Sequence, residues 1–253
     1  NENNNNKILI MEDLGNNLIY DKVNKKNFLK IYKSAIENIL NIQKIKNKKI
    51  SSYKKEKYFS ESFLFIEWVL CKFIDLKISK KDMSKLIKSL NFLVNNINHS
   101  NNKLVHRDYH SKNIFFKNNK ITIIDYQDAT YGSPIYDFVS LVNDCYRDID
   151  QNTKNKFIKF FLEMFNQNNK FNFSKDEFLY NFDLISAQRH MKASGIFCRL
   201  SIKKNRHNYL EYLNRTLNYI TKAASNYDNL KIINFFAKEA INKLNESNYS
   251  GSR

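Results

Sequence analysis

Apolar residues recur at helical spacing along most of the chain, in segments separated by polar stretches rich in Asn and Lys. Residues 27–46 carry one apolar helical face, made of Phe28, Ile31, Tyr32, Ala35, Ile36, Ile39, Leu40 and Ile42. Residues 60–76 predict a more apolar helix with Ser60 as its N-cap. Residues 79–98 begin with SKKD, a capping-box pattern, and continue as an amphipathic helix. Helical patterns resume at residue 136 and extend to about residue 245.

Short apolar runs beside turn-forming residues predict strands in two regions. Residues 7–15, KILIMEDLG, contain an apolar run that ends at two acidic residues and a glycine, which predicts a buried strand leading into a turn. The preceding NENNNN predicts a flexible loop or turn. Residues 103–129, KLVHRDYHSKNIFFKNNKITIIDYQDA, hold the apolar runs KLV and ITII, and each run predicts a short strand. No internal repeat and no Pro- or Gly-rich linker divides the chain.

Composition narrows the class of protein. The chain has 253 residues, of which 42% are hydrophobic and 14% aromatic, so it can bury a substantial core and is not disordered in composition. It is long enough for one large domain or two small ones. With only 4 Gly and 1 Pro, the sequence favours helices joined by polar loops over an all-β fold rich in tight turns.

The formal net charge of +17 raises the question of a polyanionic partner. Lys residues are spread through the whole chain, and no basic segment interleaves aromatics in a binding motif, so we expect no nucleic-acid partner. No apolar run is long enough to cross a bilayer, and we expect no membrane association. Cys71, Cys145 and Cys198 match no metal-binding spacing and suit a reducing cytoplasm, where we expect the protein.

Polar residues follow both predicted strands of residues 103–129. Asp108 follows KLV, Asn113 follows Asp108 in the pattern D-x-x-x-x-N, and Asp125 follows ITII. Oxygen side chains at strand ends, brought together by a hairpin-like arrangement, can hold Mg²⁺, and a further carboxylate can accept the proton of an attacking hydroxyl. A single Asp after a strand is more commonly a turn or cap residue, and His106 and His110 are individually more commonly structural. The ordered combination of all these residues therefore carries the prediction of phosphoryl transfer.

The segments LVHRDYHSKNIFF and IIDYQDATYGSPIYDFVSL resemble the aminoglycoside/choline phosphotransferase group of protein-kinase-like enzymes. Within that group the chain resembles the bacterial kinases that phosphorylate the anomeric hydroxyl of N-acetylmuramate and N-acetylglucosamine in cell-wall recycling. Three flanking segments carry this narrower resemblance: SESFLFIEWVL, QRHMKASGIFCRL and YLEYLNRTLNYI. The resemblance spans about residues 8–220.

The resemblance implies an α+β, protein-kinase-like fold in which most of the chain is the helical C-terminal lobe, with short β-strands at the active site. Residues 1–20 would form the end of the N-terminal lobe and the hinge, and residues 21–253 the helical lobe. The N-terminal lobe would be largely absent, because the hinge-like segment begins at residue 7. None of the four glycines can form a Gly-rich phosphate loop, and Lys7 lies at the start of the hinge strand.

The same resemblance implies roles for individual residues, with ATP and Mg²⁺ as cofactors. Asp108 would be the catalytic base, Asn113 and Asp125 would bind Mg²⁺, and His106 would brace the catalytic loop. Arg107 is expected to pair with a carboxylate. Asp137 is expected to cap the helix that follows and to brace the loop, and Asp128 to support the site or contact substrate. The hinge backbone that would meet adenine belongs to Met11, Glu12 and Asp13.

The implied partners are a small amino sugar, as the acceptor, and a nucleotide. A chain of charge +17 suits polycationic aminoglycosides poorly, and its aromatics lie at helical spacing typical of core packing more than of a choline-binding cage. Four basic residues lie on the QRHMKASGIFCRL segment and could bind a carboxylate unless these positions are solvated: Arg189, His190, Lys192 and Arg199. Arg189 and Arg199 are the candidates among them, because Arg can bind a carboxylate bidentately. Glu67 and Trp68 are further candidates for sugar contact, although Trp on an apolar helix is more commonly core.

Two alternatives to the amino-sugar kinase stay open at the level of sequence. One is a kinase of the same group that acts on an aminoglycoside, choline or another alcohol. The other is a non-catalytic pseudokinase, which a missing N-terminal lobe favours and the intact Asp108, Asn113 and Asp125 oppose.

Overall fold

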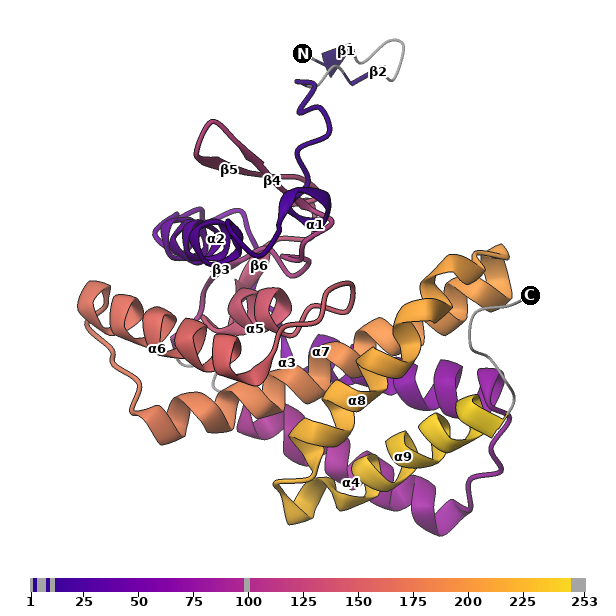
Figure 1. Cartoon of the computed structure of the whole chain (residues 1–253). Coiled ribbons are helices and arrows are strands. Elements are labelled where there is room, and N and C mark those ends of the chain that lie inside the picture. Colours follow the sequence, from indigo (N-terminus) through magenta and orange to yellow (C-terminus); the bar gives the residue numbers. More distant parts are fainter. Residues whose placement is uncertain (1, 4–7, 10–11, 98–100, 247–253) are drawn as a thin grey trace.

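The computed structural model describes residues 2–3, 8–9, 12–97 and 101–246 of the chain. Helices dominate this part, and the strands are short, which confirms the predicted α+β class (Figure 1). The α-helices are α1 (Ile19–Lys22), α2 (Phe28–Ile42), α3 (Lys55–Leu64), α4 (Lys80–Asn96), α5 (Tyr136–Val142), α6 (Gln151–Asn168), α7 (Lys175–Lys204), α8 (Leu213–Ala224) and α9 (Lys231–Glu246). A π-helix, η1 (Phe65–Phe73), continues α3, and two 3₁₀-helices, η2 (His207–Tyr212) and η3 (Asp228–Leu230), flank α8.

The strands of the described residues form three antiparallel pairs. β1 (Glu2–Asn3) pairs with β2 (Ile8–Leu9), β3 (Lys103–Val105) with β6 (Thr130–Gly132), and β4 (Ile114–Lys117) with β5 (Lys120–Ile123). The loop predicted at the start of the chain thus includes strand β1. Figure 1 shows the β4–β5 hairpin beside α1 and α2, at the opposite end of the molecule from α4 and α9.

The long helix α7 organises the helical part of the chain. It packs against α3, η1, α5, η2 and α8, and α9 packs against α8 and α4 (Figure 1). At Gly195 a Cβ atom would lie 2.5 Å from Cβ of Leu64, so only glycine lets α7 approach α3 this closely. The hydrophobic core contains stacked rings, such as Phe138 of α5 on Phe161 of α6, which confirms that many of the aromatics serve core packing.

The predicted helices are confirmed, with corrections at their ends. Ser79 is the N-cap of α4, and its side chain accepts a hydrogen bond from the Asp82 N–H. Ser60 is not an N-cap, because α3 begins after Lys54 and the Ser60 hydroxyl donates to the Lys57 carbonyl inside the helix. The helical content predicted between residues 136 and 245 corresponds to five α-helices and their connections.

Among the described residues, none of the helices combines the length and apolar character needed to cross a membrane.

Candidate active site

A tight hairpin brings Asn113 and Asp125 together. Ile114, at the start of β4, pairs with Ile123, at the end of β5, so Asn113 lies opposite Ile124, the residue before Asp125. Asn118 and Asn119 make the turn with φ values of 52° and 59°, as a two-residue hairpin turn requires. The Ile124 N–H donates to the Asn113 carbonyl at 3.1 Å, which extends the pairing by one step. The hairpin-like arrangement predicted from the sequence is therefore confirmed.

Asp108 is joined to this hairpin through its backbone. The Asn113 side-chain amide donates through Nδ2 to the Asp108 carbonyl at 3.1 Å. The His106 ring lies 2.9 Å from the Ile124 carbonyl through Nε2, which links the loop after β3 to the end of β5. The bracing role of His106, implied by the family resemblance, stays a prediction, with this contact as its structural basis.

Asp137, which lies in the protein interior, fixes the loop after β3. Its fully buried carboxylate accepts hydrogen bonds from the backbone N–H groups of His106 at 2.7 Å and Arg107 at 2.9 Å. Burial raises the pKa of Asp137, although His106 and these N–H donors oppose the shift. The predicted bracing of the loop is confirmed. The predicted helix cap is wrong, because the N-cap of α5 is Ile135 and Asp137 lies inside the helix.

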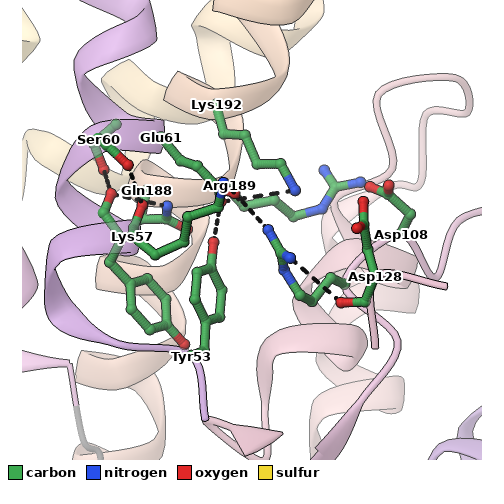
Figure 2. Close-up of polar contacts among 12 residues, drawn as sticks. Tyr53, Lys57, Ser60, Glu61, Asp108, Asp128, Gln188, Arg189 and Lys192 are labelled. Carbon is green, nitrogen blue, oxygen red and sulfur yellow. Dashed lines mark hydrogen bonds and ion pairs between the residues drawn. The ribbon is translucent and has the colours of Figure 1, made fainter. Parts of the chain in front are cut away.

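Arg107 is held in a buried charged cluster around Glu61 of α3. Figure 2 shows Tyr53 and Lys192 of this cluster directed toward Glu61. Its backbone has a φ of 75°, and its guanidinium donates to Glu61 and stacks 4.4 Å from the Tyr53 ring centroid. The Tyr53 hydroxyl also donates to Glu61, and the Lys192 ammonium lies 3.8 Å from the same carboxylate. Burial opposes ionisation of Glu61, but Lys192, Arg107 and the hydrogen bonds outweigh it and lower the pKa of Glu61. The predicted carboxylate partner of Arg107 is therefore Glu61.

Lys112, just before Asn113, lies in an aromatic enclosure. Its ammonium is 4.7 Å from the ring centroid of Tyr20, 4.5 Å from Tyr146 and 4.6 Å from Tyr212, and it donates to the Tyr212 hydroxyl at 2.9 Å. These cation–π contacts tie the loop to α1 and to the 3₁₀-helix η2. An aromatic enclosure for a cation thus exists beside the loop, but the chain's own lysine fills it.

The loop residues face a cavity of about 480 Å³ between the β4–β5 hairpin, α7 and η2. The charged residues that line it are Arg107, Asp108, Lys112, Asp125, Arg189 and Lys192, together with Asn113 and His110. The cavity also contacts apolar and aromatic residues of α7 and η2, among them Ile196, Phe197 and Tyr209. The three residues predicted to carry the chemistry, Asp108, Asn113 and Asp125, therefore share one cavity with Arg189.

The other residues predicted for substrate contact do not line this cavity. Asp128 is exposed, and its backbone carbonyl accepts from the Arg107 guanidinium at 3.3 Å. Glu67 pairs with Lys72 near the surface, and Trp68 is 5% exposed and packed in the core. Arg199 lies half-buried on α7. Arg189 itself is buried, so the solvated alternative does not apply to it.

The predicted hinge residues lie at the edge of the described chain. Glu12 and Asp13 are exposed in the loop before α1, and the Asp13 carboxylate accepts from the Gly15 N–H at 2.8 Å. Met11 lies outside the described residues.

Two residues that support the site were missed at the level of sequence. Glu61 sits in the segment SESFLFIEWVL, one of the three that carry the narrower resemblance, but it lies 46 positions before its partner Arg107. Asp144 accepts hydrogen bonds from the backbone N–H groups of Ser111 and Tyr146, each at 2.8 Å, and so fixes the middle of the loop. No local motif marks either residue, because both act through contacts made only in the folded chain.

The donor set near the hairpin suits a hard cation with few protein ligands. The Asn113 amide donates through Nδ2, which leaves its Oδ1 as an acceptor, and the Asp125 carboxylate is exposed at the same end of the hairpin. Within the described residues no group of three or more His, Cys, Asp or Glu could hold a metal ion. Two oxygen ligands fit Mg²⁺, which usually keeps waters and substrate phosphates in its shell.

Comparisons with known proteins agree on one family. Residues 11–168 match the model of the phosphotransferase enzyme family. A protein of Neisseria meningitidis serogroup B, named N-acetylmuramate/N-acetylglucosamine kinase, is 25% identical over 88% of this chain and 68% of its own length. Proteins of the same name from Pseudomonas aeruginosa and Pseudomonas putida are 23% and 25% identical, over 87% and 85% of this chain. The chain spans 64–68% of the length of these three relatives.

Solved structures resemble the described chain in fold. A choline kinase from Cryptosporidium parvum aligns with a TM-score of 0.56 at 12% identity, over 92% of this chain and 73% of its own. An amicoumacin kinase aligns with a TM-score of 0.54 at 17% identity, over 88% of this chain and 62% of its own. At these identities the likeness concerns the fold alone, and it confirms the predicted protein-kinase-like architecture.

Proposed function

Because the chain belongs to the phosphotransferase enzyme family, we propose that it transfers the γ-phosphoryl group of ATP to a hydroxyl of an amino sugar. The acceptor is the anomeric hydroxyl of N-acetylmuramate or N-acetylglucosamine, in the cytoplasmic recycling of cell-wall sugars. The names of three relatives that align over most of this chain support this choice of acceptor.

One observation carries the proposal: Asp108, Asn113 and Asp125 line the same cavity. A carboxylate that can accept a proton therefore lies beside two oxygen side chains that can hold a cation. Phosphoryl transfer needs a base, metal ligands and exact positioning, and little covalent chemistry from the protein. The backbone bonds from Asp137 and Asp144 to the loop supply the positioning, because they fix the loop on both sides of Asp108.

Asp108 accepts the proton of the sugar hydroxyl in this mechanism. The sugar oxygen forms a bond to the γ-phosphorus while the bond from that phosphorus to the β–γ bridging oxygen breaks, and ADP leaves. Asn113 and Asp125 hold Mg²⁺, which neutralises phosphate charge when it is bound. The backbone of residues 11–13 meets adenine, with residues 1–20 as the end of the N-terminal lobe and residues 21–253 as the helical lobe.

The charges around the cavity support an acceptor without positive charge. Four basic residues, Arg107, Lys112, Arg189 and Lys192, line it against the two carboxylates of Asp108 and Asp125. Burial lowers the pKa of His110 to about 4, so this histidine adds no positive charge at neutral pH. Polycationic aminoglycosides and choline would meet repulsion there, and the aromatic enclosure that could hold choline is filled by Lys112.

The test uses the full-length protein with ATP, Mg²⁺ and either sugar, with the product identified by phosphorus NMR. We expect sugar 1-phosphate and ADP in equal amounts, and a fall in kcat of about 10³-fold or more for Asp108→Asn, which keeps the size of the side chain and removes the base. An enzyme that phosphorylates neither sugar but does phosphorylate choline or an aminoglycoside would contradict the acceptor. Failure to bind ATP would indicate a pseudokinase.

A further inference from the structure

Four basic side chains line the cavity, and three of them have hydrogen-bond partners within the protein. Arg107 donates to Glu61 and to the Asp128 carbonyl. Lys112 donates to the Tyr212 hydroxyl inside its aromatic enclosure. Arg189 donates through Nε to the Ser140 hydroxyl at 2.8 Å and through Nη1 to the Cys145 sulfur at 3.5 Å.

Lys192 differs from the other three. Its ammonium makes no hydrogen bond in the part of the chain that the structure describes, and its nearest carboxylate oxygen, Glu61 Oε2, is 3.8 Å away. The Glu61 carboxylate already accepts from Arg107 on one oxygen and from Tyr53 on the other. Lys192 therefore has donors left unfilled, although the residue is only 9% exposed. A buried cation with unfilled donors is costly unless a further acceptor reaches it.

The position of Lys192 directs these donors into the cavity. Figure 2 shows its side chain extending from α7 toward the side of the Glu61 cluster on which Asp108 lies. Burial lowers the pKa of Lys192, while Asp108 and Glu61 favour its charged form. An acidic group entering the cavity would add to these carboxylates and would fill the donors that the protein leaves open.

Neighbouring basic residues on α7 are poorly placed for the same role. His190 is fully buried with its ring nitrogens 2.6 and 2.7 Å from the backbone carbonyls of Ser186 and Asn143. Burial lowers its pKa to about 3, so it is uncharged at neutral pH. Arg199, the other predicted anion ligand, does not line the cavity.

We infer that Lys192 binds the carboxylate of an acidic acceptor and so determines how well the site takes N-acetylmuramate relative to N-acetylglucosamine. The two sugars differ by one lactyl ether, which adds a carboxylate to the first. The inference rests on the proposed amino-sugar kinase function and names the residue that distinguishes its two substrates. The carboxylate takes no part in the transfer, so it is bound equally in the ground state and the transition state.

The experiment compares steady-state kinetics of wild type, Lys192→Met, Lys192→Arg and Lys57→Met with both sugars. Lys57→Met is the matched control, because Lys57 also pairs with Glu61, at 3.4 Å, but is exposed and does not line the cavity. For Lys192→Met we expect kcat/KM for N-acetylmuramate to fall about 10- to 100-fold through KM, as for the loss of a charge-assisted hydrogen bond. We expect N-acetylglucosamine to change by about twofold or less, Lys192→Arg to keep the preference, and the control to match wild type.

Two results would overturn the inference. An equal loss of kcat for both sugars in Lys192→Met would mean that Lys192 acts through Asp108 or the fold, and an unchanged preference would mean that it binds no carboxylate. Failure of the proposed function is visible separately, in the wild type: a protein that phosphorylates neither sugar would contradict that function, and the inference with it.

Discussion

Two sides of the site differ in burial and in hydrogen bonding. On the bracing side, Asp137, Glu61 and Arg107 are buried, and their charged groups are hydrogen-bonded within the protein. On the open side, Asn113 is half-buried and Asp125 is exposed, and the Asp125 carboxylate accepts a hydrogen bond from the exposed Gln127 side chain. Asp108 lies between the two sides.

The difference separates two tasks that the loop residues share. Groups of the bracing side fix the loop geometry, and their hydrogen bonds are worth most because they are shielded from water. Oxygen atoms of the open side stay accessible, which a metal ion and a phosphate require. Changes on the bracing side should therefore cost stability first, and changes on the open side should cost activity alone.

The largest effect on stability is expected for Glu61→Ala. Its removal leaves Arg107 buried without its carboxylate, and Lys192 loses its nearest ion-pair partner. We expect the free energy of unfolding, measured by urea denaturation, to fall by about 3–5 kcal/mol. Glu67→Ala is the matched control, because the Glu67–Lys72 pair is partly exposed, and we expect it to cost less than about 1 kcal/mol. Equal costs for the two variants would remove the distinction between the sides.

A smaller effect on stability is expected from pH, through His110 and His190. Burial lowers the pKa of His110 from 6.5 to about 4 and that of His190 to about 3. Below pH 6.5 the unfolded chain binds protons that the folded chain does not, so stability is present above that pH and is lost as the pH falls toward 4. We expect a loss of roughly 2–3 kcal/mol per histidine across this range, measured by denaturation at successive pH values. His190→Gln should make the free energy of unfolding depend less steeply on pH. An unchanged slope would mean that His190 does not contribute to this pH dependence.

The open side could be predicted from the sequence because its determinants are local. Asp108, Asn113 and Asp125 lie within 18 positions. The hairpin between Asn113 and Asp125 depends on a short turn in the same segment of sequence. Asp125 also has a φ of 68°, a conformation that Asp tolerates better than most residues.

The bracing side could be predicted only in part. The motif predicts that Asp137 braces the loop, and this prediction is confirmed. The predicted helix cap is wrong, because the Asp137 carboxylate accepts a hydrogen bond from the backbone N–H of Arg107, 30 positions earlier in the chain. Glu61 could not be found, since its burial depends on how α3 packs against α7, through the close approach at Gly195. Glu67 and Trp68 are the candidates for sugar contact that the sequence suggests on the same segment, but helical rotation places Glu61 beside the loop and Trp68 in the core.

Asp125→Asn tests the central claim, that the open side performs the chemistry without holding the fold. Asn keeps the shape, the acceptor for Gln127 and the tolerance of positive φ, and removes only the charge. We expect kcat/KM for the amino sugar to fall about 10³-fold or more, while the free energy of unfolding changes by less than about 0.5 kcal/mol. Retained activity, or a loss of several kcal/mol of stability, would contradict the claim.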